Sequence, residues 1–214
     1  MNKRRITGGL YLVVDPSIEG VLVKVDEALK GGVDVIQVWN KRDGAFNQVS
    51  FINAMCCLAD IYEVPVIVHN DVQLLINTDA HGIHFDELPE DLHTLRRQMK
   101  RPVIVGVTCG NNRQEIARAI DAPVDYLSFC SMYPSLNGGD CELIMPQVVS
   151  QTRQYTSLPI FLAGGVTPEN TKSLMTLGGD GVAIVSGILK AKDCCQAARE
   201  FKEQLNIFKT QPLT

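Results

Sequence analysis

Short runs of apolar and β-branched residues recur along this chain at intervals of about 20–30 residues, and this repeat limits what the chain can fold into. Most of the runs are almost continuously apolar, as is typical of strands in a parallel sheet that is covered on both faces. Eight such runs are present, namely Leu10–Val14, Val33–Val38, Val66–His69, Gly82–Phe85, Val103–Val107, Tyr126–Phe129, Ile160–Ala163 and Gly181–Val185.

Segments with helical spacing of apolar residues follow each of these runs. They are Gly20–Lys30, Phe46–Ile61, Val72–Asn77, Leu88–Met99, Arg113–Ile120, Met145–Tyr155, Pro168–Leu177 and Ile188–Leu205. Eight strand–helix units in 214 residues predict an α/β fold, a single (β/α)8 TIM barrel that occupies residues 1–214 as one domain. An open, doubly wound sheet is the alternative.

The composition favours a globular protein that acts on small molecules. Hydrophobic residues make up 45% of the chain, and the net charge of −4 comes from interspersed acids and bases. The chain has no basic run, which argues against nucleic acid or an anionic membrane as partner. No apolar run approaches the roughly 20 residues of a membrane span. The expected partners are small-molecule substrates, and the sequence leaves the oligomeric state open, a homodimer included.

The cysteines indicate a reducing compartment. The chain has seven, including the adjacent pairs Cys56-Cys57 and Cys194-Cys195, and none has the CxxC spacing of a zinc or dithiol site. An odd number, with no signal peptide in the sequence, predicts reduced thiols and a cytoplasmic location.

A barrel of this kind carries its active site at the carboxyl ends of its strands, on the loops that follow them. Polar residues at these positions are therefore expected to converge on one mouth. They are Gln37–Arg42, His69–Asp71, Asp86-Glu87, Thr108, Ser131, Ser135–Gly139, Gly164-Gly165 and Ser186-Gly187.

The seventh run ends in Gly164-Gly165 and leads into a helix start at Thr167, in the stretch FLAGGVTPEN. Glycine allows a sharp turn and a close approach to backbone N–H groups, and a helix N-terminus suits an anion. With Val185 at the end of the eighth run and Ser186 after it, these residues predict a phosphate site. Tight packing without a ligand is the alternative explanation of the glycines.

Asn70 and Asp71 follow the third run and place an amide and a carboxylate at the mouth. Mg²⁺ takes one or two protein carboxylates and completes its shell with water and substrate phosphate, so Asp71 could hold it. A helix cap in front of Val72 is the other interpretation of Asp71. Lys41 and Arg42 could neutralise a diphosphate, or could form a solvated surface.

The remaining ionisable groups give little indication of covalent chemistry. His69 and His84 lie inside strand patterns and are interpreted as hydrogen-bonded core residues, while His81 and His93 carry no pattern. The sequence shows no Ser/His/Asp or Cys/His arrangement, which argues against a covalent hydrolase.

Eight motifs in order resemble the thiamine-phosphate synthase family across nearly the whole chain. They are LYLVVDP, IQVWNK, HND, DAHGIHF, VGVT, DYLSFCSMYPS, PIFLAGGVTPEN and DGVAIVSGI. The resemblance implies a (β/α)8 transferase that joins hydroxymethylpyrimidine diphosphate to a thiazole phosphate, with Mg²⁺ and cationic side chains stabilising the pyrophosphate that leaves. The related thiazole tautomerases share the barrel.

The resemblance also implies roles for individual residues. Asp71 matches the first metal ligand, and Lys41, Asp71 and Thr108 match the groups closest to the chemistry. The second metal aspartate of the family falls on Pro89, which leaves Asp91, Glu87 or Glu90 as the second ligand. The implied substrate-binding residues are Gln37, Asn40, Lys41, Asn70, Thr108, Ser135, Asn137, Gly165, Val185 and Ser186.

The chain departs from the family pattern where the diphosphate is expected. Trp39 stands in place of an arginine, Asn40 in place of a glutamate, and Gly138 in place of a lysine. An indole ring cannot replace a guanidinium on a diphosphate. Two alternatives therefore stand beside the synthase: an isomerase like the tautomerases, and a non-catalytic barrel that binds a phosphorylated ligand.

Overall fold

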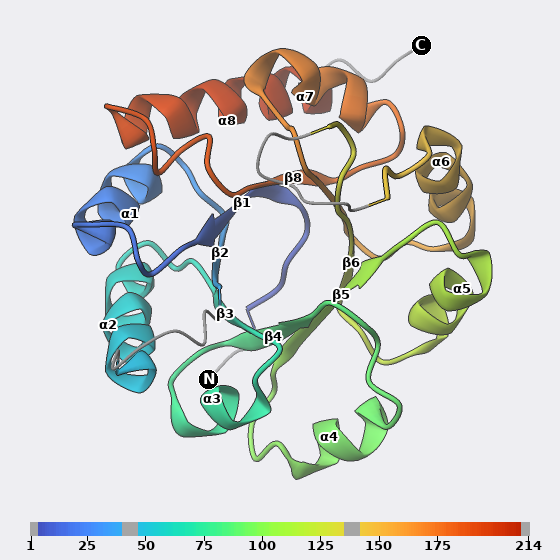
Figure 1. Cartoon of the computed structure of the whole chain (residues 1–214), viewed down its shortest axis with the longest axis horizontal. Coiled ribbons are helices and arrows are strands. Elements are labelled where there is room, and N and C mark those ends of the chain that lie inside the picture. The colour runs from blue at the N-terminus through green and yellow to red at the C-terminus, as the bar shows by residue number, and fades with distance from the viewer. Residues whose placement is uncertain (1–3, 40–46, 135–141, 211–214) are drawn as a thin grey trace.

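The computed structural model describes residues 4–39, 47–134 and 142–210, and these segments form a closed parallel barrel with the strand order β1 to β8. Figure 1 looks along the barrel, with the strands in a central ring and the helices around it. The strands are β1 Gly9–Val14, β2 Val35–Val38, β3 Val66–His69, β4 Gly82–Phe85, β5 Ile104–Cys109, β6 Tyr126–Phe129, β7 Ile160–Ala163 and β8 Gly181–Ile184. The helices are α1 Val21–Lys30, α2 Gln48–Asp60, α3 Val72–Asn77, α4 Leu92–Gln98, α5 Arg113–Asp121, α6 Pro146–Tyr155, α7 Pro168–Met175 and α8 Cys194–Thr210.

The structure confirms the expected barrel, and it moves the start of two helices. The last helix begins at Cys194 instead of Ile188, because the Asp193 carboxylate accepts the backbone N–H of Gln196 and caps the helix there. The fourth helix begins at Leu92 instead of Leu88, since Asp91 caps it in the same way. Apolar spacing alone predicts that both helices begin earlier, because residues in the turns before them also pack on the barrel.

The interior of the barrel is filled by large side chains, as in other packed barrels. Three aromatic rings occupy its centre: Tyr11 and Phe161 have centroids 5.1 Å apart, and Tyr126 and Phe161 have centroids 5.5 Å apart. Both pairs meet edge to face, the arrangement that aromatic quadrupoles favour. The barrel is therefore closed by side chains beneath the mouth.

Aspartates in front of three strands join the barrel to its helices at the end opposite the mouth. Each accepts a backbone N–H from the neighbouring strand and pairs with a cation from a helix. The pairs are Asp34 with Lys202, Asp125 with Arg96, and Asp180 with Arg153. These contacts stabilise the lower end of the barrel, so that the upper loops are carried on a rigid base.

Gly106 on β5 tests how tightly the central rings are packed. A Cβ on Gly106 would lie 2.0 Å from Cζ of Tyr126. We therefore expect Gly106→Ala to lower the free energy of unfolding by about 1–3 kcal/mol, the usual effect of overpacking a core. Gly110→Ala is the matched control, because nothing lies within 4 Å of that position. Urea unfolding of both variants measures the difference, and equal midpoints would contradict it.

Candidate active site

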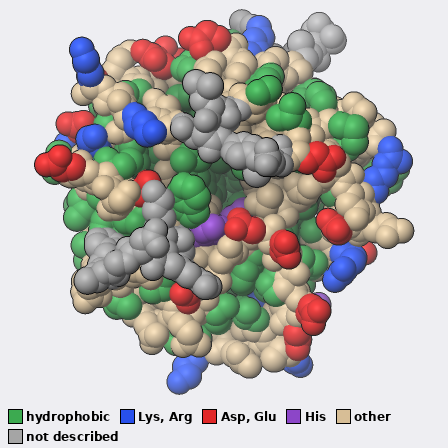
Figure 2. All heavy atoms as spheres, in the orientation of Figure 1, with side chains coloured by type: hydrophobic (Ala, Val, Ile, Leu, Met, Phe, Trp, Pro, Cys, Tyr) green, Lys and Arg blue, Asp and Glu red, His purple; other side chains and the backbone are tan. Residues whose placement is uncertain are grey.

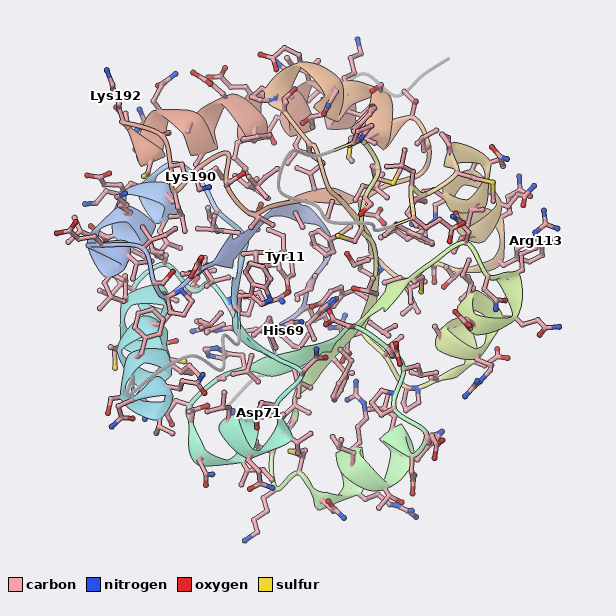
Figure 3. The ribbon with its side chains drawn as sticks, viewed as in Figure 1. Tyr11, His69, Asp71, Arg113, Lys190 and Lys192 are labelled. Carbon is pink, nitrogen blue, oxygen red and sulfur yellow. The ribbon has the colours of Figure 1, made fainter. Side chains whose placement is uncertain are left out.

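The mouth of the barrel contains the polar side chains at the carboxyl ends of the strands. Figure 2 shows a hollow in the centre of this face with histidine atoms at its base and acidic side chains along one side. In Figure 3, Tyr11 and His69 lie near the barrel axis, and Asp71 lies farther out at the start of α3. The site is thus built from the upper layer of the barrel interior.

A chain of hydrogen bonds crosses this layer from β5 to β2. Tyr11 donates its hydroxyl hydrogen to Oε1 of Gln37 over 2.7 Å, and the Tyr11 and Tyr126 hydroxyls are 2.9 Å apart. His84 Nδ1 lies 2.9 Å from the Tyr126 hydroxyl, and His84 Nε2 lies 2.9 Å from Oγ1 of Thr108. Since each hydroxyl has one hydrogen, Tyr126 donates to Tyr11, His84 donates from Nδ1, and Thr108 donates to Nε2.

Burial keeps this chain uncharged. Desolvation lowers the pKa of His84 to about 4, with the neighbouring His69 adding to the effect. Burial likewise raises the pKa of the Tyr11 and Tyr126 hydroxyls. The interpretation of His84 as a hydrogen-bonded core residue is consistent with both of its ring nitrogens having partners.

A second cluster joins the ends of β3 and β4. Asp86 accepts from Nδ2 of Asn70 over 2.7 Å, and its own backbone N–H donates to Oδ1 of the same amide over 2.9 Å. The other Asp86 oxygen lies 2.9 Å from Nε2 of His69. The His69 hydrogen bond, followed by that of Asn70, helps to hold the pKa of the Asp86 carboxyl below its ordinary value. Asn70 has a left-handed φ of 56°, so backbone and side chain together fix its direction.

The two predicted metal aspartates both serve as helix caps. Asp71 accepts the backbone N–H of Leu74 over 3.0 Å, and Asp91 accepts that of Thr94 over 2.9 Å. Within residues 4–39, 47–134 and 142–210, no three His, Cys, Asp or Glu side chains are grouped to hold a metal ion. A cap uses one lone pair of one oxygen, so each carboxylate keeps further acceptor capacity. The remaining acceptor capacity of Asp71 is compatible with an ion that takes few protein ligands and shares the rest with a phosphorylated substrate, as Mg²⁺ does.

The turns after β7 and β8 lie next to each other, because Ala163 pairs with Ala183 and two more residues lead to Gly165 and Val185. Gly165 and Val185 are exposed and Ser186 is half-buried. Gly164 and Gly165 have φ of 89° and 64°, and a Cβ would lie 2.4 Å from the Ser131 nitrogen or 2.7 Å from Cβ of Tyr133. Packing against the loop after β6 therefore requires both glycines, whether or not a phosphate binds there.

The structure brings several predicted site residues to the mouth and leaves others undescribed. Gln37 and Thr108 form the two ends of the hydrogen-bond chain, and Asn70 belongs to the second cluster. Glu87 and Glu90 are exposed in the turn after β4. The predicted residues that lie outside the described segments are Asn40, Lys41, Arg42, Ser135 and Asn137.

Sequence reasoning missed two contributors to the mouth and the contacts of a third. Tyr11 and Tyr126 are fully buried on strands whose two faces are both covered, so alternation did not mark them as facing the barrel interior. Asp86 was grouped with the rim, and its pairing with Asn70 and His69 depends on the register His69↔His84 between β3 and β4. Polar residues at equivalent ends of adjacent parallel strands were the available indication.

Comparison with known proteins identifies the family. The family model described as thiamine monophosphate synthase matches residues 10–188, which is most of the chain. The chain belongs to the thiamine monophosphate synthase family. Its eight-stranded barrel and the polar mouth agree with that membership.

Relatives of this family match the chain over nearly their whole length. Thiamine-phosphate synthase of Methylobacillus flagellatus is 30% identical over 200 residues, covering 92% of this chain and 95% of the relative. The Bacillus cereus enzyme of the same name is 31% identical over 189 residues, covering 86% and 85%. A solved thiamine phosphate pyrophosphorylase from Pyrococcus furiosus superposes with a TM-score of 0.80 at 23% identity, covering 93% and 96%, and so shares the fold.

The described cysteines and helices add two observations. Cysteines 56, 57, 109, 194 and 195 are free thiols. None of the helices within the described segments has the length and apolar character that crossing a bilayer requires.

Burial of His84 predicts a pH dependence of stability. The unfolded chain binds a proton on this side chain near pH 6.5, whereas the folded protein does so only near pH 4. Lowering the pH through this interval therefore favours unfolding, by up to about 3 kcal/mol from this residue. Urea unfolding at pH 7 and pH 4.5 should show a smaller loss in His84→Asn than in the parent protein. His93→Asn, at an exposed position, is the control. If His84→Asn loses as much stability between pH 7 and pH 4.5 as the parent protein does, the assignment is refuted.

Gly165→Ala should be more destabilising than Gly20→Ala. Both glycines have nearly the same φ, 64° and 65°, so the backbone strain of about 1–2 kcal/mol is common to both. Only Gly165 adds a clash, with Cβ of Tyr133, which cannot move without its backbone. We expect an additional loss of about 1 kcal/mol or more in urea unfolding. Equal losses would show that the turn after β7 can open.

Proposed function

We propose that this member of the thiamine monophosphate synthase family couples hydroxymethylpyrimidine diphosphate with a thiazole phosphate at the mouth of the barrel, giving thiamine phosphate and pyrophosphate. The observation that carries the proposal is the family match over residues 10–188, together with relatives named thiamine-phosphate synthase that align over almost their full length. The protein is accordingly a transferase of thiamine biosynthesis, with small molecules as its substrates.

The two substrates occupy different parts of the mouth. The thiazole phosphate lies at the adjacent turns after β7 and β8, where Gly165, Val185 and Ser186 offer backbone N–H groups and a hydroxyl. The pyrimidine lies over the layer that contains Gln37 and Thr108, and its diphosphate extends toward Asn70 and Asp71. Ser135 and Asn137 contribute to the thiazole phosphate site, and Asn40 and Lys41 to the diphosphate site.

Bond formation requires electrostatic support and placement of the two rings. The bond between the pyrimidine methylene carbon and the diphosphate oxygen breaks, the electron pair leaves with pyrophosphate, and the thiazole nitrogen supplies the pair for the new C–N bond. The protein holds the nitrogen in line with the carbon and excludes water from the rings. Lys41 adds positive charge near the leaving oxygens, while the uncharged chain from Gln37 to Thr108 orients the pyrimidine.

Asp71 would hold Mg²⁺, with Asp91, Glu87 or Glu90 as the second carboxylate. When bound, the ion would neutralise charge on the diphosphate that departs. Asp71 remains a helix cap in this arrangement, because the N–H of Leu74 uses only part of its acceptor capacity.

Formation of thiamine phosphate from both substrates and Mg²⁺, followed by chromatography, tests the proposal directly. Product that appears only when all components are present is the expected result. Thermal stabilisation by thiazole phosphate alone, without product, would instead favour a barrel that only binds a phosphorylated ligand.

Asp71→Asn separates the metal role from the cap. Asparagine is as good a cap as aspartate, so we expect unfolding midpoints within about 0.5 kcal/mol of the parent. Loss of the charge should lower the rate of product formation by about 100-fold or more. Asp193→Asn, which alters the cap of α8 in the same way, is the matched control and should keep full activity. Full turnover in Asp71→Asn would exclude the metal role.

A further inference from the structure

One buried polar atom in the mouth has no partner. Within the described part of the chain, Nδ1 of His69 is the buried side-chain nitrogen or oxygen for which no hydrogen bond is found. The His69 side chain is 10% exposed, and its residue lies two positions after Ile67, which belongs to the apolar layer inside the barrel. Side chains two apart on a strand share a face, so His69 points into the barrel, as Figure 3 shows beside Tyr11.

The partner of the other ring nitrogen determines what Nδ1 can do. Nε2 of His69 lies 2.9 Å from Asp86, and a carboxylate only accepts hydrogen bonds, so the hydrogen in this contact belongs to Nε2. In the neutral ring the lone pair is then on Nδ1. In this neutral form Nδ1 is a buried acceptor without a donor, a state that costs about 1–3 kcal/mol.

The neighbouring groups do not supply this donor. Nδ2 of Asn70 approaches Nε2 at 3.2 Å, not Nδ1, and its shorter bond of 2.7 Å goes to Asp86. The hydroxyl hydrogens of Thr108, Tyr126 and Tyr11 are used within the hydrogen-bond chain. Nδ1 thus remains a buried acceptor that no described side chain satisfies.

The surroundings of His69 decide which chemistry suits this acceptor. A lone pair backed by the ionised Asp86 repels anions, so phosphate oxygens are unsuitable. The Tyr11 and Tyr126 rings, tilted by 53° to each other, belong to the apolar layer inside the barrel, against which an uncharged ring can pack. The fitting ligand is an uncharged aromatic ring that carries an N–H donor.

We propose that Nδ1 of His69 accepts a hydrogen bond from the exocyclic amino group of the pyrimidine substrate, with Asp86 as the positioning residue that fixes the ring and its tautomer. The inference rests on the proposed function, since the pyrimidine brings the amino group and the neutral thiazole has no N–H. Binding includes a small movement of the side chains that cover Nδ1. His69 then determines specificity for an aminopyrimidine over the same ring without the amino group.

Isothermal titration with two ligands tests this proposal: hydroxymethylpyrimidine diphosphate, and the analogue in which hydrogen replaces the amino group. The parent protein should bind the amino compound about 10-fold or more tightly, because the analogue leaves Nδ1 unpaired. His69→Leu should reduce this ratio to near one, chiefly by weakening binding of the amino compound. His69→Gln, whose carbonyl can accept, should restore part of the preference, which a purely structural role of His69 would not produce.

Two further variants complete the experiment. Asp86→Ala should lower the ratio, and His93→Leu, at an exposed position, should leave the ratio as in the parent. A parent protein that forms thiamine phosphate but shows the same ratio as His69→Leu would overturn the inference and leave the proposed function intact. A parent protein that binds neither compound and forms no product would overturn both. Urea midpoints of each variant confirm that the compared proteins are folded.

Discussion

The Tyr126 ring at the centre of the barrel is the contact on which the remainder of the mouth depends. It lies where a side chain on Gly106 would be, it forms a T-shaped pair with Phe161, and its hydroxyl joins the chain to Tyr11. The ring therefore closes the barrel from below and supplies the middle of the polar layer above. Packing and hydrogen bonding are satisfied by one side chain, so the floor of the site and the core are the same structure.

Much of the fold could be predicted from the sequence, because strands covered on both faces appear as unbroken apolar runs and capped helices follow them. Burial of both strand faces also prevents the sequence from showing which side chains line the site. When both faces of a strand are buried, nothing in the pattern says that Tyr11 faces the barrel interior and Leu12 faces the helices. Helix starts at Leu92 and Cys194 were set by capping aspartates, which the apolar spacing did not reveal.

The sequence predicted which residues of the candidate site lie at the mouth better than it predicted the contacts that they make. Gln37, Asn70, Asp71 and Thr108 all lie at the ends of strands, as barrel geometry requires, whereas their partners depend on strand register. The double glycine illustrates the difference: an anion site was one interpretation, and the backbone near Ser131 and Tyr133 accounts for both residues by packing. A phosphate at this turn would use a geometry that the loop after β6 already imposes.

The hydrogen-bond chain from Thr108 to Gln37 has a consequence for how this barrel can change. All four bonds run in the same direction from Thr108 to Gln37, so no bond can reverse unless its neighbours reverse as well. Replacing Thr108 with valine would keep its shape but orphan a nitrogen of His84, and replacing Tyr11 would do the same to Tyr126. Substitutions at the five positions on β1, β2, β4, β5 and β6 are therefore coupled. A change on one strand is tolerated only together with a compensating change on another.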